Sequence, residues 1–387
     1  MAIGVVHNES SIALKAEVTE GTYVPAAAAT DYVECLSSGL ELVKNTEELA
    51  RDTLGGTVES EASRTGVPEV SGSIPVELRA SATEGGYPQS LDIQLRSLLG
   101  GRRTAATANT TTGATSTVLT FASHPFLKGD SVLVKESNNF EVRPVSAITS
   151  TTITFPFALD NGAPSDGVTV AAVGTYYHDT VNAISFSAEY NIGNEIQDQV
   201  DGLRVTSGAI ENWTVGTIPT FTCAVVGQDS ARSNDTQSYT PNFTADALPP
   251  VTLEACLWVG GAKLSYSELS LSIENEVSPI TDACVASGKQ GHRIIGQKVS
   301  FSANPYMDDT TFATYTSWEN NSDTSVFFYA FNPSSTTGEF SEAVAVWIPQ
   351  GKITAHPTGD ANGLATDALE IKAHRSSGND SVFMSFI

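Results

Sequence analysis

The sequence predicts a mainly β protein with two related units, each carrying one short helix, and a small inserted β domain. Apolar and polar residues alternate strictly in several segments, which is the pattern of strands with one buried face. Charged residues make up 17% of the 387 residues, and Ser, Thr, Gly and Ala are abundant, which favours strands and turns over long helices. The order strand, long polar loop, strand and helix occurs twice. A repeat of this size indicates a duplicated domain.

The first unit follows an N-terminal segment, residues 1–30, in which residues 12–17 can pair as a strand. We predict the first strand of the unit over residues 31–43. Residues 45–66 then form a polar loop that is too long for a hairpin turn. The charged residues of this loop that we single out are Glu47, Glu48, Arg51, Asp52, Glu59, Glu61 and Arg64.

The next strand, residues 70–79, has the clearest alternation of the first unit. Ile74, Val76 and Leu78 point to one face, whereas Glu77 and Arg79 point to the other. A short helix follows, with Ser90 as the expected N-cap and Asp92 in the first turn. The apolar stripe of this helix is Leu91, Leu95, Leu98 and Leu99, and the helix ends at Gly100 and Gly101.

The second unit repeats this order. Residues 264–276 form a strand whose apolar face is Leu269, Leu271 and Ile273, and whose polar face includes Glu268 and Glu274. A polar loop at residues 277–292 and a strand at residues 297–303 follow. The helix after that strand has Asp309 as its expected cap, and Phe312, Tyr315 and Trp318 lie near one face.

The predicted first unit comprises residues 1–101 and 179–245, the insert residues 102–178, and the second unit residues 246–387. Five basic residues of the insert balance five acidic ones, so the rest of the chain carries the whole net charge of −24. They are Arg102, Arg103, Lys128, Lys135 and Arg143 against Asp130, Glu136, Glu141, Asp160 and Asp166. This charge argues against a protein that grips DNA or an anionic membrane, but it allows DNA to pass through a hole.

These segments resemble the tail tube proteins of long, non-contractile bacteriophages. The resemblance rests on the strand Val-Ser-Gly-Ser-Ile-Pro-Val-Glu-Leu at residues 70–78, on the helix ending in Leu-Leu-Gly at residues 98–100, and on the second set of strands at residues 269–280 and 296–303. It covers most of the chain outside the insert. It implies tail-tube β-sandwich or barrel units, with the small, β-barrel-like insert as an outer decoration.

The resemblance also implies a structural virion protein, not an enzyme, that assembles into stacked rings. The rings form the hollow tail tube that conducts genomic DNA into the host cell. The implied partners are copies of itself, as three chains per ring with pseudo-sixfold symmetry or as six chains, and tape-measure and tail terminator or tip proteins. DNA would pass without specific binding, and neither a membrane partner nor a cofactor is implied. The protein would belong to the virion tail and be assembled in the host cytoplasm.

Two sets of residues are candidates for function in such a tube. If the apolar faces of the strands form the core, the polar faces line the bore or its rims. The lumen-facing candidates are Glu77, Arg79, Glu268 and Glu274. The charged residues of the loop at 45–66 are candidates for contacts between rings, with a solvated loop as the alternative.

The sequence holds no pattern typical of a catalytic or metal site. It has no phosphate-binding Gly loop, no His-x-x-x-His and no Cys-x-x-Cys, and its six histidines are scattered. The alternative function is an extracellular β-rich adhesin or carbohydrate-binding module, for which the insert alone would suffice. A secretion signal would favour that alternative, whereas the first residues lack the basic and long apolar segments of a signal peptide.

Overall fold

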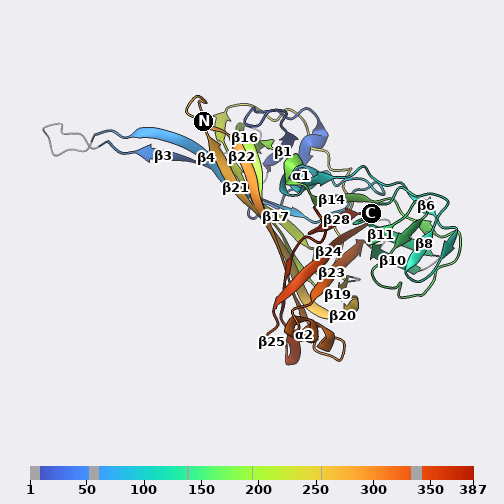
Figure 1. Ribbon diagram of the computed structural model, residues 1–387. Helices are drawn as coiled ribbons and strands as arrows, with labels where there is room; N and C mark the ends of the chain where they lie inside the picture. Colours follow the sequence, from blue (N-terminus) through green and yellow to red (C-terminus); the bar gives the residue numbers. More distant parts are fainter. Residues whose placement is uncertain (1–8, 52–60, 137–138, 194, 254, 333–341) are drawn as a thin grey trace.

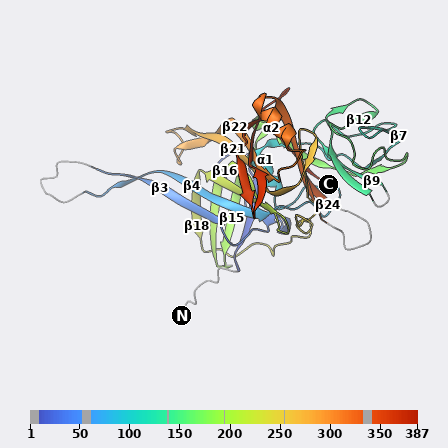
Figure 2. The same ribbon diagram turned by 90° about the horizontal axis from the view of Figure 1, so that it is seen from below.

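A computed structural model gives the fold of residues 9–51, 61–136, 139–193, 195–253, 255–332 and 342–387. The prediction of a mainly β protein is confirmed, because strands dominate these residues beside two short α-helices. Figure 1 shows a twisted body of sheets, from which the β3–β4 hairpin projects on one side while the insert lies on the other. Figure 2 shows the same arrangement from below.

Among the described residues, the first unit contains eight strands, one α-helix and the two 3-10 turns given below. Its strands are β1 (Ser11–Ala16), β2 (Tyr32–Val33), β3 (Glu41–Leu49), β4 (Arg64–Glu77), β15 (Phe186–Ile192), β16 (Ile196–Thr214), β17 (Thr220–Gly227) and β18 (Asp229–Ser233). Helix α1 (Asp92–Leu98) follows β4, and the 3-10 turns lie at Ala29–Asp31 and Thr180–Asn182.

The second unit has matching elements in the same order. They are β19 (Cys256–Val259), β20 (Ala262–Leu264), β21 (Tyr266–Thr281), β22 (Lys289–Pro305), α2 (Phe312–Glu319), β23 (Asp323–Asn332), β24 (Glu342–Ala355), β27 (Leu369–Ala373) and β28 (Phe383–Phe386). A small extra hairpin, β25 (Thr358–Ala361) and β26 (Leu364–Asp367), lies between β24 and β27.

The antiparallel pairings of the two units repeat. In the first unit they are β1–β2, β1–β15, β3–β4, β4–β17, β15–β16, β16–β17 and β16–β18. Their counterparts in the second unit are β19–β20, β19–β23, β21–β22, β22–β27, β23–β24, β24–β27 and β24–β28. The expected internal repeat therefore extends to the connectivity of every one of these strands.

Among the described strands, one pair joins the two units, and we call it the internal seam. The C-terminal half of β16 pairs with β21, from Ser207 opposite Glu274 to Thr214 opposite Glu268. The seam makes one continuous sheet, the inner sheet, in the order β3-β4-β17-β16-β21-β22-β27-β24. Helix α1 packs on β16 and helix α2 packs on β24, so the helices also occupy matching places.

The core lies behind the inner sheet, as the alternation predicts. Ile74, Val76 and Leu78 of β4 are buried, and so are Leu269, Leu271 and Ile273 of β21. All four leucines of the α1 stripe are fully buried against them. After α1 the chain turns at Gly100, whose φ of +85° and distance of 1.8 Å from an added Cβ to the Asp179 carbonyl oxygen require glycine.

The insert consists of two small four-stranded sheets. One is β10-β9-β13-β6, from β6 (Asn109–Thr110), β9 (Ser131–Glu136), β10 (Asn139–Pro144) and β13 (Thr169–Val170). The other is β11-β12-β8-β7, from β7 (Gly113–Ala114), β8 (Val118–Thr120), β11 (Ala147–Ile148) and β12 (Thr152–Thr154). The flanking strands β5 (Gly100–Arg102) and β14 (Gly174–His178) pair with each other, and β14 also pairs with β28. Both ends of the insert are thus anchored in the large sheet.

The insert shares a core with the second unit and is more than a tethered decoration. Trp258, Phe327 and Trp347 of the second unit lie in one buried cluster with Phe157 and other apolar residues of the insert. The rings of Phe157 and Trp258 stack at 5.5 Å, and the Arg143 guanidinium lies 4.7 Å from the Trp258 ring centre. Removing the insert would therefore expose large aromatic side chains.

Several local predictions were wrong. Residues 31–43 are not one strand, because Asp31 accepts hydrogen bonds from the N–H groups of Ala27 and Ala28 and holds a turn before β2. The polar loops at 45–66 and 277–292 are shorter than predicted, because β3, β4, β21 and β22 continue into them as long hairpins.

Both predicted helix caps were also wrong. The N-cap position of α1 is Leu91, and Ser90 instead donates its N–H, at 3.0 Å, and its hydroxyl to the Asp246 carboxylate. The N-cap position of α2 is Thr311, and the preceding turn is held by Asp308 rather than Asp309.

Candidate functional site

From β17 to β24, the inner sheet presents one broad polar face to solvent, whereas Pro75 of β4 is buried. Directly paired residues of neighbouring antiparallel strands point to the same side of a sheet. One row across seven of its eight strands runs Pro75, Thr222, Ala209, Ser272, Ser300, Lys372 and Lys352. The adjacent row, Ile74, Cys223, Gly208, Ile273 and Val299, points into the core. The outward rows consist mainly of small hydroxyl and charged side chains.

Two of the four lumen-facing candidates lie fully on this polar face. Glu268 and Glu274 are exposed on β21, where Glu268 precedes Ser272 by four residues and Glu274 follows it by two. Glu274 lies opposite Lys298 of β22, and Glu268 Oε1 accepts a hydrogen bond from Asn304 Nδ2 at 2.5 Å. These carboxylates remain in contact with solvent.

The other two candidates form an ion pair at the border of the face. Glu77 ends β4 opposite Thr220, and its carboxylate contacts the guanidinium of Arg79. Arg79 Nη1 also lies 2.5 Å from Glu34 Oε2, and the Arg79 side chain is only 12% exposed. The structure therefore brings Glu77 and Arg79 together, and each reduces the charge that the other presents.

The polar face also carries charges that the alternation at residues 70–79 and 264–276 did not single out. The carboxylates are those of Glu211, Glu276 and Glu370. The ammonium groups are those of Lys298, Lys352 and Lys372. Glu211 belongs to a strand whose apolar pattern is interrupted by a bulge between Ile210 and Trp213, so the sequence pattern alone did not place it. Carboxylates outnumber lysines on this face.

The predicted loop at residues 45–66 belongs to the outer part of the β3–β4 hairpin. We call the whole β3–β4 hairpin the arm. Glu47 and Glu48 lie on β3 and Arg64 begins β4, while Arg51 Nη2 lies 3.0 Å from Glu61 Oε2 across the arm. Asp52 and Glu59 lie outside the described residues. Within the described strands, β3 pairs with β4 alone, so its other edge is open. The arm projects from the body in both views (Figures 1 and 2).

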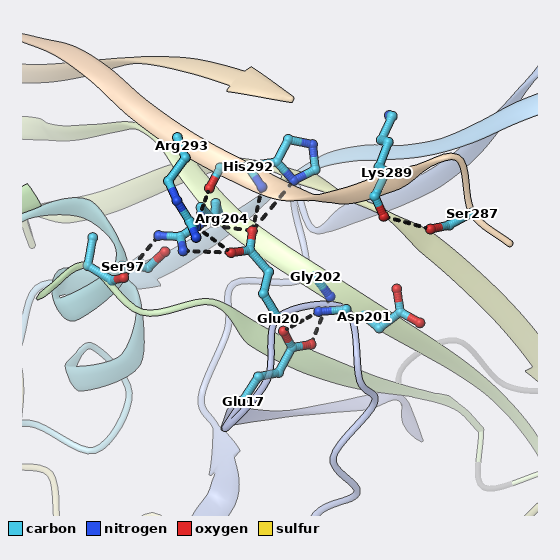
Figure 3. A network of polar contacts seen from close by, with 12 residues as sticks. Glu17, Glu20, Ser97, Asp201, Gly202, Arg204, Ser287, Lys289, His292 and Arg293 are labelled. Carbon is cyan, nitrogen blue, oxygen red and sulfur yellow. Dashed lines mark hydrogen bonds and ion pairs between the residues drawn. The ribbon is translucent and has the colours of Figure 1, made fainter. Parts of the chain in front are cut away.

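A cluster of charged residues clamps the internal seam (Figure 3). Glu20, in the loop after β1, lies 2.9 Å from Arg204 of β16 and 2.9 Å from Arg293 of β22, measured from Oε2 to the guanidinium nitrogens. Its Oε1 accepts the N–H of His292 at 2.5 Å. Burial would raise the pKa of Glu20, but the hydrogen bonds from Arg204 and His292 and the charge of Arg204 together lower it.

Another acidic residue drawn in Figure 3, Asp201, behaves in the opposite way. Asp201 lies next to Gly202, whose N–H donates to Glu17 Oε1 at 2.7 Å (Figure 3). Burial and the nearby charge of Glu17 raise the pKa of Asp201 to about 6. Glu20 therefore stabilises the charged seam, while Asp201 is charged at neutral pH against an unfavourable environment.

Two residues of the β21–β22 hairpin, Asn275 and Gln297, connect the second unit to α1 by hydrogen bonds. Asn275 Nδ2 donates to the Leu98 carbonyl oxygen at 2.8 Å, and Gln297 Nε2 donates to Asn275 Oδ1 at 2.9 Å. The carbonyl of the last α1 residue is thus satisfied by the neighbouring unit. A further contact joins β22 to β4 at the base of the arm, where Lys289 Nζ lies 2.7 Å from Glu69 Oε2.

Within the described residues, no group of three or more His, Cys, Asp and Glu side chains is arranged to hold a metal ion. Neither α-helix of that part of the chain is long and apolar enough to cross a membrane. The structure thus defines a β-rich protein of duplicated units, with a broad polar sheet face, an open edge strand and a projecting hairpin. The chain belongs to the phage tail tube protein family, whose model matches residues 7–373. No curated protein matches the sequence significantly.

Proposed function

We propose that this protein assembles into stacked rings that form the hollow tail tube through which genomic DNA enters the host cell. The observation that carries the proposal is the internal seam, because it shows how one unit joins the next edge to edge. By the repeat, β3 is the counterpart of β21, and its outer edge is open among the described strands. Similarly, β24 is the counterpart of β16, and beyond Lys352 it pairs with β27 alone among the described strands. Joining β24 of one chain to β3 of the next would continue the inner sheet into a closed barrel without free edges.

The proposed number of chains in each ring rests on the repeat. Each chain contributes two units with the same pairing pattern, so three chains would close a ring with threefold symmetry and pseudo-sixfold shape. A ring of six chains, in which the second unit serves another role, is the alternative. The continuous inner sheet through both units favours three chains.

The polar face of the inner sheet would line the bore. Duplex DNA carries one phosphate charge about every 1.7 Å, so a basic lining would bind it and slow it. Carboxylates such as Glu268 and Glu274, among small serine side chains, would keep DNA off the wall without specific binding. At physiological salt this repulsion acts within about 8 Å of the wall, where contact would otherwise occur.

The charged residues that the structure describes on the outer part of the arm would contact the next ring of the stack. Arg51 and Glu61 pair with each other across the arm. In the tail, the tube would also meet tape-measure and terminator or tip proteins, and assembly would take place in the host cytoplasm.

Cryo-electron microscopy of the purified, polymerised protein tests these proposals. We expect hollow tubes with three chains per ring, β3 paired with β24 of a neighbour, and the polar face toward the axis. Monodisperse monomers under all assembly conditions would contradict the tube, and six chains per ring would contradict the threefold ring alone.

A further inference from the structure

An acidic cavity of about 670 Å³ opens beside α2, at the end of the body that carries β25 and lies away from the arm (Figure 1). Its lining includes the carboxylates of Asp308, Asp309 and Asp367 and the ring of His356. Asp367 is buried, and its Oδ1 lies 3.6 Å from His356 Nδ1. Among the described residues that line the cavity, none is a lysine or an arginine. A cavity of this charge favours a cationic side chain as its occupant.

An open strand edge borders the cavity. The β24–β27 pairing ends with Ala355 opposite Glu370, and the β25–β26 pairing begins with Thr358 opposite Asp367, in the same register. β24 and β25 therefore form one side of a single long hairpin. Beyond Lys352, this side has no second partner among the described strands.

The backbone of this edge can accept a further strand. The Pro357 carbonyl oxygen accepts the Ala368 N–H at 2.9 Å, so the Pro357 backbone faces the inside of the hairpin. Because successive residues of a strand face alternate edges, the N–H and C=O groups of His356 and Thr358 face the open edge. The proline thus lies where a neighbouring strand does not need an N–H group.

The internal seam is built on the matching hairpin of the first unit. Both β16 and β24 carry a bulge of one residue, at Thr206 and at Thr354. In each bulge the threonine hydroxyl donates to a carbonyl oxygen across the hairpin at 3.2 Å. Residues 355–358 therefore correspond to residues 207–210, which pair with β21 at the internal seam.

The two helices agree with this correspondence. Helix α1 lies over Gly208, where an added Cβ would be 2.5 Å from Leu98 Cδ2. Helix α2 lies over His356, whose ring centre is 5.6 Å from that of Tyr315 and 6.1 Å from that of Trp318. Gly208 and His356 thus occupy the same place beneath the helices of the two units.

The repeat also assigns the residue of β3 that would face His356. The register across β17 and β4 and across β27 and β22 places two serines at matching positions, Ser71 and Ser300. Continued into β3 and β21, the same register matches Lys44 to Ile273. Since Ile273 pairs with Gly208 at the internal seam, Lys44 of one chain would pair with His356 of the next.

We propose that the acidic cavity beside α2 receives Lys44 from β3 of the neighbouring chain in the same ring. This proposal rests on the proposed ring and deepens it to one contact. Lys44 lies on the helix side of the sheet, because it pairs with Val70, which is fully buried in the core. Beside His356, its ammonium group would form a charge-assisted hydrogen bond with the Asp367 carboxylate.

Lys44 is available for this contact. In its own chain its Nζ lies 2.5 Å from Asp229 Oδ1 and 2.8 Å from the Ser230 carbonyl oxygen, and 38% of its side chain is exposed. At the internal seam the same place holds the apolar Ile273, which is fully buried. The seam within a chain is thus apolar where the seam between chains would be ionic, so ring closure would weaken with salt while the folded chain stays intact.

Lys44→Glu tests the charge. It places a carboxylate against Asp367 of the neighbour, so the protein concentration needed for assembly at low salt should rise about tenfold or more. Monomer unfolding should change little, because Lys44 and Asp229 form an exposed pair. Lys128→Glu is the matched control, since this lysine of the insert is 42% exposed on its side chain and contacts Asp380. Asp229→Asn, which removes the partner of Lys44 within its own chain, is the second control. Both controls should assemble at the wild-type concentration.

A disulfide between chains tests the register. On the polar face, Val43 would lie opposite Pro357 of the neighbour, one residue from Lys44. Chains carry Cys284→Ser, which removes the exposed native thiol, and either Val43→Cys or Pro357→Cys, so mixed tubes can link these positions only between chains. We expect mild oxidation to link them. A control with Glu41→Cys in place of Val43→Cys should link at least about fivefold less, because a disulfide requires Cα atoms within about 7 Å.

Normal assembly of Lys44→Glu, or an equal loss of assembly in either control, would overturn the proposal while leaving the tube intact. Tubes in which position 41 links to position 357 as well as position 43 does, or in which neither links, would do the same. If Lys44→Glu does not fold, the cysteine pair decides alone. Failure of the wild-type protein to form tubes would instead contradict the proposed function.

Discussion

Glu20 Oε2 lies 2.9 Å from Arg204 Nη2, and this contact ties the loop after β1 to the strand at the centre of the inner sheet. Arg204 is only 7% exposed on its side chain, so its charge depends on this partner. Because Glu20 also contacts Arg293 and the His292 N–H, one carboxylate holds the two units together at the seam.

We expect Glu20→Gln to destabilise the monomer by roughly 2–4 kcal/mol, because it leaves a buried arginine charge without its counter-charge. The exposed Glu195→Gln is the matched control and should change stability little. Denaturant unfolding of both variants measures the difference. A loss below about 0.5 kcal/mol for Glu20→Gln would contradict a stabilising clamp.

The same contact predicts a pH dependence. The pKa of Glu20 is lower in the folded protein than its ordinary value of 4.5, so its contribution is complete above that value and is lost as the pH falls through the folded pKa. The stability difference between wild type and Glu20→Gln should therefore be constant near neutrality and shrink below about pH 4. A difference that persists unchanged to pH 2 would show that the charge is not responsible.

Asp201→Asn should stabilise the protein at neutral pH. The folded pKa of about 6 exceeds the ordinary value of 3.8, so the unfavourable charge develops as the pH rises between these values. The asparagine removes this cost, on the order of 1–3 kcal/mol, and preserves the acceptor for the Asp229 N–H. Unfolding at pH 8 and pH 4 measures it, with Asp166→Asn as control. A gain as large at pH 4 as at pH 8 would contradict the electrostatic explanation.

The sequence predicts best where one face of a strand is buried. Ile74, Val76 and Leu78, or Leu269, Leu271 and Ile273, alternate because their polar neighbours face solvent, so strand and face are both readable. The extension of β3 to Leu49 was not predictable in this way, because that stretch is exposed on both faces and shows no periodicity of burial. The burial of Trp258 and Phe327 against the insert was likewise not predictable. An apolar residue buried by a distant segment has the same sequence pattern as one buried within its own unit.

The candidate site was predictable in kind but not in detail. The polar face of β21 followed from alternation, whereas the Glu77–Arg79 ion pair depends on the end of β4 and on Glu34 from a distant segment. The role of Glu20 could not be read from the sequence, because its three partners come from β16 and β22, far along the chain.

Shortening the arm should separate folding from assembly. Replacing residues 46–68 by an Asn-Gly turn joins Asn45 to Glu69, which face each other in register, and retains the Glu69–Lys289 pair. Since the removed side chains that the structure describes are mostly exposed, monomer stability should change by less than about 1 kcal/mol. Thermal unfolding and negative-stain microscopy measure both effects, and tubes should be absent. The control exchanges Arg51 and Glu61, which keeps their pairing, and should still assemble.

Excising the insert should damage the protein, contrary to the view of the insert as a dispensable decoration. Ala106 and Val173 pair directly, so residues 107–172 can be replaced by a short Gly-Ser turn. The deletion exposes Trp258, Phe327 and Trp347, each of which loses about 1.5–3 kcal/mol of burial. We expect aggregation and dye binding to exposed apolar surface. Soluble, tube-forming protein after the excision would contradict a structural role for this interface.

Reversing charge on the polar face tests the proposed bore. Glu268→Lys, Glu274→Lys and Glu370→Lys together change exposed side chains without breaking the Glu77–Arg79 pair, so tubes should form normally. A basic wall attracts phosphates, so virions with these tubes should eject DNA more slowly at low ionic strength. The delay should vanish in about 1 M salt, where the screening length is about 3 Å. The control exchanges Glu274 and Lys298, which face each other in register, and conserves the net charge of the wall. Ejection at the wild-type rate in low salt, with the substitutions verified in the tubes, would remove the electrostatic argument for an acidic bore.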